Sequence, residues 1–439
     1  MGLVDAELGS HRRVSKHANA TRTAPSLWRR LGPGLITGAA DDDPSGIATY
    51  SQVGVRVGYD ILWTALLTFP LMVGIQAVSA RIGRVTGQGL AANIRQQFPP
   101  WILYGVVVLL LIANTINIAA DIGAMGAALN LLVAGPAHWY AMAFGLVSLL
   151  LQVFVPFPSY SPVLKTLTLA LLAYVVAVFF VDVPWREVIY HTLVPSISLD
   201  ATYLVAVVAV FGTTISPYLF FWQASQEVEE QRGASGELPL KRAPEQARTE
   251  LKRIAFDTHI GMGLSNLVAF CIMLTAVAGL RMHGVVDIET SAQAAAALRP
   301  VAGDLAFALF AVGIIGTGLL AVPVLAGSAA YAAAEAFKWR SGLGRRPANA
   351  RGFYAVLIIA VLLGVGLNFT SVDPIRALFW SAVINGVIAV PIMALMMMLA
   401  VKREVMGQFV INRWLRLLGW GATTVMALGV LGMIVTWTT

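Results

Sequence analysis

The most constraining feature of this chain is the sequence Asp43-Pro44-Ser45-Gly46, which lies inside its first long apolar segment. Pro44 has no backbone N–H to donate and Gly46 loosens a helix, so together they predict a broken membrane-spanning helix. Broken backbone at membrane depth is tolerated only where it is packed in protein or lines a cavity. A carboxylate beside such a break needs a partner, and a cation is the obvious one. Asp43 therefore predicts a cation site in the middle of a transporter.

The composition identifies the class of protein. Of the 439 residues, 58% are hydrophobic and only 12% are charged, which is typical of an integral membrane protein. The single cysteine, Cys271, lies in an apolar run and excludes a disulfide framework. Residues 1–30 are polar and basic and lack the pattern of a signal peptide, so we expect a cytoplasmic tail. We find no nucleotide-binding loop, zinc motif or nucleophile constellation, so we expect neither an enzyme nor a cofactor.

Eleven apolar stretches are long enough to cross a bilayer, which takes roughly 20 residues. The predicted spans cover residues 33–53, 61–80, 102–133, 139–155, 163–181, 201–222, 257–280, 304–337, 353–369, 375–401 and 415–435. The expected transporter core covers residues 31–401 and contains two five-span repeats, 31–182 and 200–401. A cytoplasmic loop is expected over 224–256, and a cytoplasmic connection with the eleventh helix over 402–439.

The basic residues segregate between the connecting segments as the positive-inside rule requires. With the amino terminus inside, 25 of the 30 Lys and Arg residues fall on the cytoplasmic side. An odd number of spans then places the carboxyl terminus outside. We expect a protein of a prokaryotic cytoplasmic (inner) membrane, with the lipid bilayer and divalent metal ions as its partners. The net charge of +7 reflects this topology, so neither nucleic acid nor an obligate protein partner is expected.

A second break is predicted in the sixth span, where Gly212 and Pro217 interrupt an apolar run. Either break alone is also explained by a plain proline kink. Two breaks in corresponding positions of two five-span halves indicate an inverted-repeat transporter with a midplane site. The half-helices that precede the two breaks would both direct unpaired carbonyls and partial negative charge at the midplane. The sequence therefore predicts a cation site between the two breaks.

The ligands available at these breaks are hard oxygens. We predict a metal site made of Asp43, Gly46, Thr213 and Ser216, with the Asp43 carboxylate, the Thr213 carbonyl and the Ser216 hydroxyl as donors. The hydroxyl of Thr214 is a further candidate. No Met, Cys or His is placed to join them, and an oxygen-only site favours magnesium, calcium or manganese over iron, copper or zinc.

Four more residues are candidates for the vestibule or the gate: Asp42, Tyr218, Asp121 and Asn385. Three successive carboxylates on a helix point about 100° apart, so at most two of Asp41, Asp42 and Asp43 face the ion path. Polar packing between helices is the alternative for the first two, and a structural hydrogen-bonding role is the alternative for Asp121.

Three glutamates, Glu227, Glu229 and Glu230, follow the sixth span at the expected cytoplasmic mouth. They would either gather cations there or form a solvated acidic helix end, and we favour the solvated helix end.

Several motifs in combination make the chain similar to the Nramp family of divalent-metal transporters over nearly its full length. They are Gly32-Pro33-Gly34 before the Asp-Pro break, Ser79 to Gly87 after the second span, Asp121, Leu325-Ala326-Gly327 and Met406-Gly407-Gln408-Phe409. The resemblance implies an all-α integral membrane fold of the leucine-transporter type. It would have eleven transmembrane helices in a 5+5 inverted repeat, with helices 1 and 6 unwound around the ion.

The chain departs from the usual Nramp pattern where the family handles metal and protons. Where the family has Asp-Pro-Gly-Asn, this chain has Asp43-Pro44-Ser45-Gly46. Where the family has Met-Pro-His, this chain has Ser216-Pro217-Tyr218. Its Asp-x-x-Glu is Asp121 to Ala124, which loses the glutamate, and the ninth span lacks the arginine pair. The tenth-helix glutamine corresponds to Ala382, with Asn385 one turn away. These losses resemble the Nramp-related magnesium transporters, which move magnesium and manganese without clear proton coupling.

We therefore expect transport of Mg²⁺, with Mn²⁺ as a second substrate, by alternating access and without proton coupling. Magnesium gives up its water reluctantly, and the smaller Gly46 and Ser216 leave room for a hydrated ion. The alternative is a proton-coupled Mn²⁺/Fe²⁺ importer of the ordinary Nramp type. A receptor that has kept the fold is disfavoured because Asp43 and both breaks are intact. An organic-cation or amino-acid carrier is disfavoured because no aromatic pocket or carboxylate anchor is evident.

Overall fold

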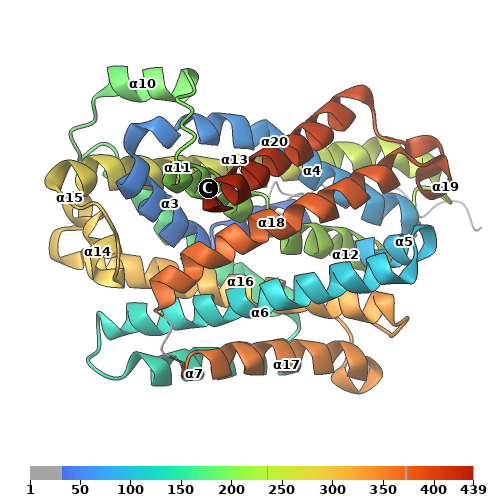
Figure 1. The fold of residues 1–439 in the computed structure, drawn as a ribbon. Helices are drawn as coiled ribbons and strands as arrows, with labels where there is room; N and C mark the ends of the chain where they lie inside the picture. Colours follow the sequence, from blue (N-terminus) through green and yellow to red (C-terminus); the bar gives the residue numbers. More distant parts are fainter. Residues whose placement is uncertain (1–31, 235, 371–372, 439) are drawn as a thin grey trace, which may run out of the picture.

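The computed structural model describes residues 32–234, 236–370 and 373–438, which form an all-helical bundle (Figure 1). The α-helices of the first half are α2 (Pro33–Asp41), α3 (Pro44–Val57), α4 (Trp63–Thr86), α5 (Leu90–Gln97), α6 (Pro100–Asn130), α7 (Ala137–Phe154), α8 (Phe157–Thr168), α9 (Leu172–Ala177) and α10 (Trp185–Leu193). Those of the second half are α11 (Ala201–Thr214), α12 (Pro217–Gly233), α13 (Ala247–Gly279), α14 (Ser291–Ala296), α15 (Arg299–Ala302), α16 (Ala306–Ala336), α17 (Arg351–Leu367), α18 (Pro374–Val401), α19 (Arg403–Met406) and α20 (Arg413–Thr438). The predicted cytoplasmic tail, residues 1–30, lies outside the described residues.

Eight helical segments in the described part of the chain are long and apolar enough to cross a membrane. The other three predicted spans consist of shorter helices. The first is divided between α2 and α3, and the fifth between α8, the 3-10 turn η2 (Leu169–Leu171) and α9. The ninth is α17, an apolar helix of 17 residues. A predicted span can therefore be made of helical pieces, each of them shorter than the bilayer is thick.

The connecting segment after the sixth predicted span is shorter than expected. α12 continues to Gly233 and α13 begins at Ala247, so helix occupies much of the predicted loop over 224–256. The segment between them meets α4, since the backbone N–H of Leu240 donates to the Arg84 carbonyl. One end of the bundle, on the right in Figure 1, contains α5, α19, the C-terminal end of α12 and the N-terminal end of α13. We call this the basic end, because it carries the predicted cytoplasmic segments.

Glycine residues allow two pairs of helices to cross with their backbones in close contact. A Cβ atom added to Gly38 of α2 would lie 2.3 Å from the carbonyl oxygen of Gly261 in α13. One added to Gly212 of α11 would lie 2.1 Å from the carbonyl oxygen of Ala382 in α18. Small residues let membrane helices approach backbone to backbone, where dispersion contacts are densest. These two crossings bring α13 and α18 against the segments that contain the predicted breaks.

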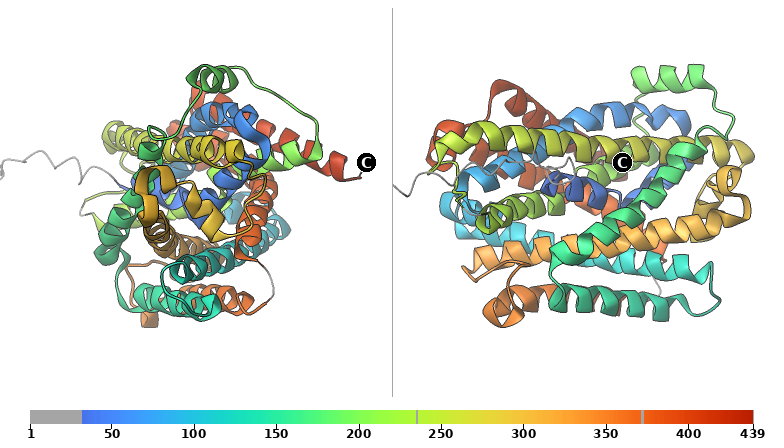
Figure 2. Two further views of the ribbon diagram at one scale, coloured as in Figure 1. Left: turned by 90° about the vertical axis from the view of Figure 1, so that its left-hand side faces the viewer. Right: turned by 180° about the vertical axis from the view of Figure 1, so that it is seen from behind.

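The helices α7 and α17 form an outer layer on one edge of the bundle in both orientations (Figures 1 and 2). α7 exposes large apolar side chains, including Leu150 and Phe154, and α17 exposes Ile359 and Leu363. Such faces are suited to lipid, which solvates apolar side chains as readily as a protein core does. The core that holds the breaks lies on the other side of α6 and α16.

Candidate metal centre

The first predicted break is confirmed. α2 ends at Asp41 and α3 begins at Pro44, which leaves Asp42 and Asp43 outside both helices. Asp43 has an extended backbone (ψ 172°), and its carboxylate accepts a hydrogen bond from the Gly46 N–H at 2.7 Å. Asp43 is thus the N-cap of α3, and Pro44 occupies the first helical position, where its missing donor costs nothing. The same proline that interrupts one helix starts the next.

The second predicted break is confirmed as well. α11 ends at Thr214, α12 begins at Pro217, and Ile215 and Ser216 lie between them. The Ser216 hydroxyl lies 2.8 Å from the carbonyl oxygens of both Gly212 and Thr213. The last carbonyls of a helix have no intrahelical donor, and here a side-chain hydroxyl serves two of them. Ser216 and the Thr213 carbonyl, both predicted metal ligands, are therefore in direct contact.

The two breaks face each other across a short distance. The Tyr218 hydroxyl lies 3.1 Å from Asp43 Oδ2 and also donates to the Ala40 carbonyl at 3.0 Å, so α12 is bound to both sides of the first break. A Cβ atom on Gly46 would lie 3.5 Å from Thr213 Oγ1. The predicted site residues thus meet, and Tyr218 contacts Asp43 directly.

The tenth predicted span, α18, completes one side of the centre. Ser45 Oγ lies 3.1 Å from the Leu378 carbonyl and 3.2 Å from Ser381 Oγ. The sequence analysis named Asn385 here and missed Ser381, a hydroxyl directly before Ala382 that marks the position. Asn385 is buried, and its side-chain oxygen has no hydrogen-bond partner among the described residues.

Asp41 and Asp42 are joined through α13. The Ser265 hydroxyl lies 2.6 Å from Asp41 Oδ2 and 3.1 Å from Asp42 Oδ1. Asp42 also lines a cavity of about 40 Å³ between α2 and α13, together with Ser265 and Leu171. The cavity fits the vestibule role and the Ser265 contacts fit the alternative, polar packing between helices, so the role of Asp42 stays a prediction. The sequence analysis missed Ser265. The only sequence signal is a serine within an apolar helix.

Asp121 of α6 is fully buried; the backbone N–H of Ser45 interacts with its carboxyl group, although not within the distance and angle of a regular hydrogen bond. It lies close enough to Asp43 for the two carboxyl groups to interact. A buried carboxyl with weak hydrogen bonding is costly, and such residues in membrane helices often have functional roles. Asp121 adds an acid beside the centre, and both roles considered for it, gating and structural hydrogen bonding, stay predictions.

The donor set suits a cation in transit. Asp43, Thr213 and Ser216 are all at most 3% exposed. Among the described residues, no group of three or more His, Cys, Asp and Glu side chains is arranged to hold a metal. One carboxylate with neutral carbonyl and hydroxyl oxygens is a hard site. A transported ion must bind strongly enough to enter and weakly enough to leave, which a single carboxylate permits.

The N-terminus of α2 is capped by Asp257 of α13. The Asp257 carboxylate accepts from the N–H groups of Gly34 (2.6 Å), Gly32 (3.0 Å) and Leu35 (3.2 Å), and so caps α2. A carboxylate at a helix N-terminus satisfies unpaired donors and interacts favourably with the helix dipole. Since α2 leads directly into the first break, this cap ties the position of the break to α13.

The interpretation of the three glutamates as a solvated helix end is wrong for Glu227. This side chain is fully buried, and Arg253 of α13 lies 2.5 Å from its carboxylate. Arg253 also contacts Glu230 at 3.2 Å and Glu250 at 2.9 Å. A buried carboxylate needs such a partner. The arginine lies 26 residues further along the chain, so the sequence pattern around Glu227 alone does not reveal the pair.

Comparisons with known proteins find relatives over nearly the whole chain. Residues 34–436 match the family described as Nramp, natural resistance-associated macrophage protein-like. The divalent metal cation transporter MntH of Acidiphilium cryptum is 28% identical, with 95% of this chain and 93% of that protein covered. The MntH of Verminephrobacter eiseniae is also 28% identical, with 92% and 90% covered.

Two solved structures share the fold. A crystal structure of a mutant of the Eremococcus coleocola manganese transporter superposes with a TM-score of 0.71 at 19% identity, covering 94% of this chain and 87% of that chain. Mhp1, a nucleobase-cation-symport-1 family transporter, superposes with a TM-score of 0.56 at 12% identity, covering 93% and 92%. The described residues therefore have the leucine-transporter-like fold of these membrane proteins.

Proposed function

The chain belongs to the Nramp family, a family of transporters rather than enzymes, and from this premise we propose that it carries divalent metal cations across a membrane. The observation that carries the proposal is the buried meeting of two helix breaks, where Tyr218 contacts Asp43 and Gly46 lies beside Thr213. Carbonyls at the ends of unwound membrane helices are an established way to bind a cation. Alternating access around this point would expose it to each side in turn.

The finer architecture belongs to the same proposal. We infer eleven spans, of which the first ten form two inverted five-span repeats with the broken first and sixth spans in equivalent positions. The bacterial relatives and the basic end favour a cytoplasmic membrane, with the basic end facing the cytoplasm.

The named relatives favour the alternative weighed in the sequence analysis, an ordinary Nramp transporter, over a dedicated magnesium carrier. We therefore propose Mn²⁺ as the main substrate. Magnesium is the second candidate on one observation: every donor at the centre is an oxygen, and hard oxygen sites accept both ions. The test is uptake of Mn²⁺ and Mg²⁺ into proteoliposomes. Uptake of neither ion would reject divalent metal transport, and faster Mg²⁺ uptake would restore the magnesium interpretation.

Selectivity should respond to Ser216. Ser216→Met introduces a thioether beside the Thr213 carbonyl, and sulfur favours softer ions such as cadmium and iron. We expect the ratio of Cd²⁺ to Mg²⁺ transport to rise severalfold. The matched control is Ser216→Ala, which removes the hydroxyl without adding sulfur and should not raise the ratio. Gly46 is a poorer place to add an amide, since its Cβ would lie 3.0 Å from the Asp41 carbonyl oxygen. An unchanged ratio in folded Ser216→Met protein would place the ion elsewhere.

Metal entry should be accompanied by protons. The sequence analysis expected no coupling because the family's glutamate, histidine and arginine pair are missing, but Asp41 and Asp42 adjoin Asp43 in the chain and Asp121 of α6 interacts with it. Chains of buried acids are the usual proton relays in transporters. We expect Mn²⁺ influx at symmetric pH to acidify the liposome lumen, and Asp121→Asn to reduce the protons moved per metal ion. The exposed Asp373→Asn is the control. Influx without acidification would support uncoupled transport.

A further inference from the structure

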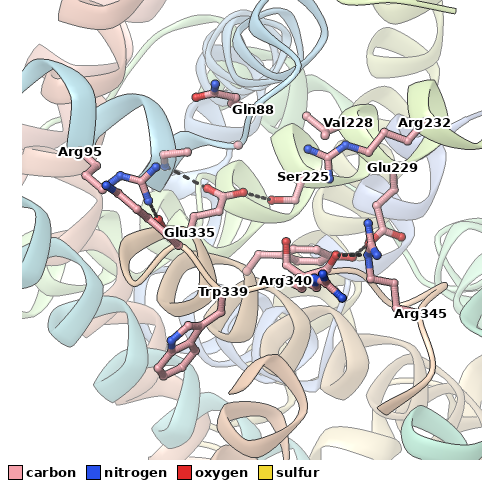
Figure 3. Close-up of a pocket in the computed structure, with 15 residues that line it drawn as sticks. Gln88, Arg95, Ser225, Val228, Glu229, Arg232, Glu335, Trp339, Arg340 and Arg345 are labelled. Atoms are coloured by element: carbon pink, nitrogen blue, oxygen red, sulfur yellow. Dashed lines mark hydrogen bonds between the residues drawn. The ribbon is translucent and has the colours of Figure 1, made fainter. Parts of the chain in front are cut away.

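A cavity of about 230 Å³ opens at the basic end, away from the metal centre (Figure 3). It lies between α5, the end of α12 and the loop that follows α16, and its floor includes the buried Tyr331. Five cationic residues line it: Arg95, Arg232, Lys338, Arg340 and Arg345. Two acidic residues, Glu229 and Glu335, also line it, which leaves a formal charge of +3. None of these residues belongs to the proposed transport path.

The two carboxylates are already occupied by neutral donors. Glu335 accepts from the Ala92 N–H at 3.1 Å, where it caps α5, and lies 3.4 Å from the Ser225 hydroxyl. Glu229 accepts from the Leu343 N–H at 2.9 Å and from the Tyr331 hydroxyl. Both acids therefore stabilise the walls of the cavity through these uncharged groups.

The cations are not in short ion pairs, although Arg232 lies close enough to Glu229 and Glu335 to interact electrostatically with both. None of the five forms an ion pair within 4.0 Å among the described residues. Arg95 and Arg345 donate instead to backbone carbonyls, those of Glu335 and Ser341. Arg340 is exposed, lines the cavity and has no hydrogen-bond or ion-pair partner among the described residues. Guanidinium groups are forked donors that match phosphate oxygens, so a cluster of unpaired arginines is suited to a phosphate.

The surroundings place this cavity at a membrane surface. Trp339 lines it and stacks on Phe337, whose ring lies 5.7 Å from that of Tyr104. These three rings and the nearby Trp101 are all exposed, by 44–74%. Exposed aromatic rings at the ends of membrane helices sit at the level of lipid headgroups. Basic pockets at the cytoplasmic ends of spans are suited to anionic headgroups.

We propose that this cavity binds a phosphate-bearing anion, and that the adjoining aromatic rings assign it to the headgroup of an anionic phospholipid. The phosphate would contact Arg340 and Arg345, and the acyl chains would lie along the exposed rings of Phe337 and Trp339. The bound lipid would hold the loop after α16 against α5 and α12. This site is independent of the ion carried by the protein.

The test uses the full chain purified in detergent. Binding of phosphatidylglycerol, phosphatidylcholine and inorganic phosphate is measured separately by native mass spectrometry and by the shift in thermal unfolding. The variant is Arg340→Gln with Arg345→Gln, and the matched control is Arg242→Gln with Arg403→Gln. The control removes two exposed cations at the same end, outside the cavity. Unfolding without added ligand checks that each variant is folded.

We expect phosphatidylglycerol to bind the wild type and the control equally and phosphatidylcholine to bind weakly. The double variant should bind phosphatidylglycerol about 25-fold more weakly, since each basic residue near anionic lipid contributes about fivefold. Binding of inorganic phosphate alone, lost in the double variant, would support the anion site and assign it to a soluble ligand. Binding of neither anion, or equal losses in the variant and the control, would overturn the proposal.

Discussion

Asp43→Ala is expected to abolish metal transport. The variant removes the one carboxylate that stands directly at the meeting of the two breaks, in contact with Gly46 and Tyr218. It also removes the N-cap of α3, which typically costs about 1 kcal/mol of stability. The effect on transport is expected to be far larger than the effect on folding. Initial rates of Mn²⁺ and Mg²⁺ uptake into proteoliposomes measure the first, and thermal unfolding measures the second.

Asp43→Asn separates the two roles of this residue. Asparagine caps helices about as well as aspartate, so this variant should keep the bond from the Gly46 N–H and unfold like the wild type. It lacks the negative charge, so it too should be inactive. Wild-type uptake in either folded variant would show that the ion does not bind at the first break.

Gly212→Ala is expected to destabilise the protein and to stop transport, although it adds a single methyl group. The new Cβ would lie 2.1 Å from the Ala382 carbonyl oxygen and 2.5 Å from the Gly386 backbone nitrogen. Backbone atoms cannot rotate away as a side chain can, so α11 must move off α18. That movement would displace the Thr213 carbonyl, which directly follows Gly212, and with it one wall of the metal centre.

The matched control is Gly105→Ala in α6, where a Cβ would meet nothing within 4 Å. Alanine is favoured over glycine in a helix by about 1 kcal/mol, so this variant should be as stable as the wild type or slightly more so. Thermal unfolding and Mn²⁺ uptake are measured for both. Equal behaviour of the two variants would mean that α11 and α18 do not pack this closely.

Much of the fold could be predicted from the local chemistry of the chain. Pro44 and Pro217 lack the N–H that would continue the preceding helix, and each lies at the first position of the helix after a break. Pro70, Pro323 and Pro391 lie inside helices, so proline alone does not require a break. The apolar stretches and the placement of Lys and Arg likewise predicted a membrane protein with one basic end. These properties depend on single residues or on short windows, so a sequence pattern carries them.

The partners of the buried acids could not be predicted in this way. Ser265 joins Asp41 to Asp42 from more than 220 positions away, and Asp257 caps α2 from a similar separation. The local sequence predicts Glu227 as part of a solvated helix end, whereas the fold places Arg253 beside it. Whether a carboxylate is solvated, paired or isolated depends on which helices cross there. Those crossings are set by the packing of small residues such as Gly38, Gly212 and Gly261, which a local pattern does not reveal.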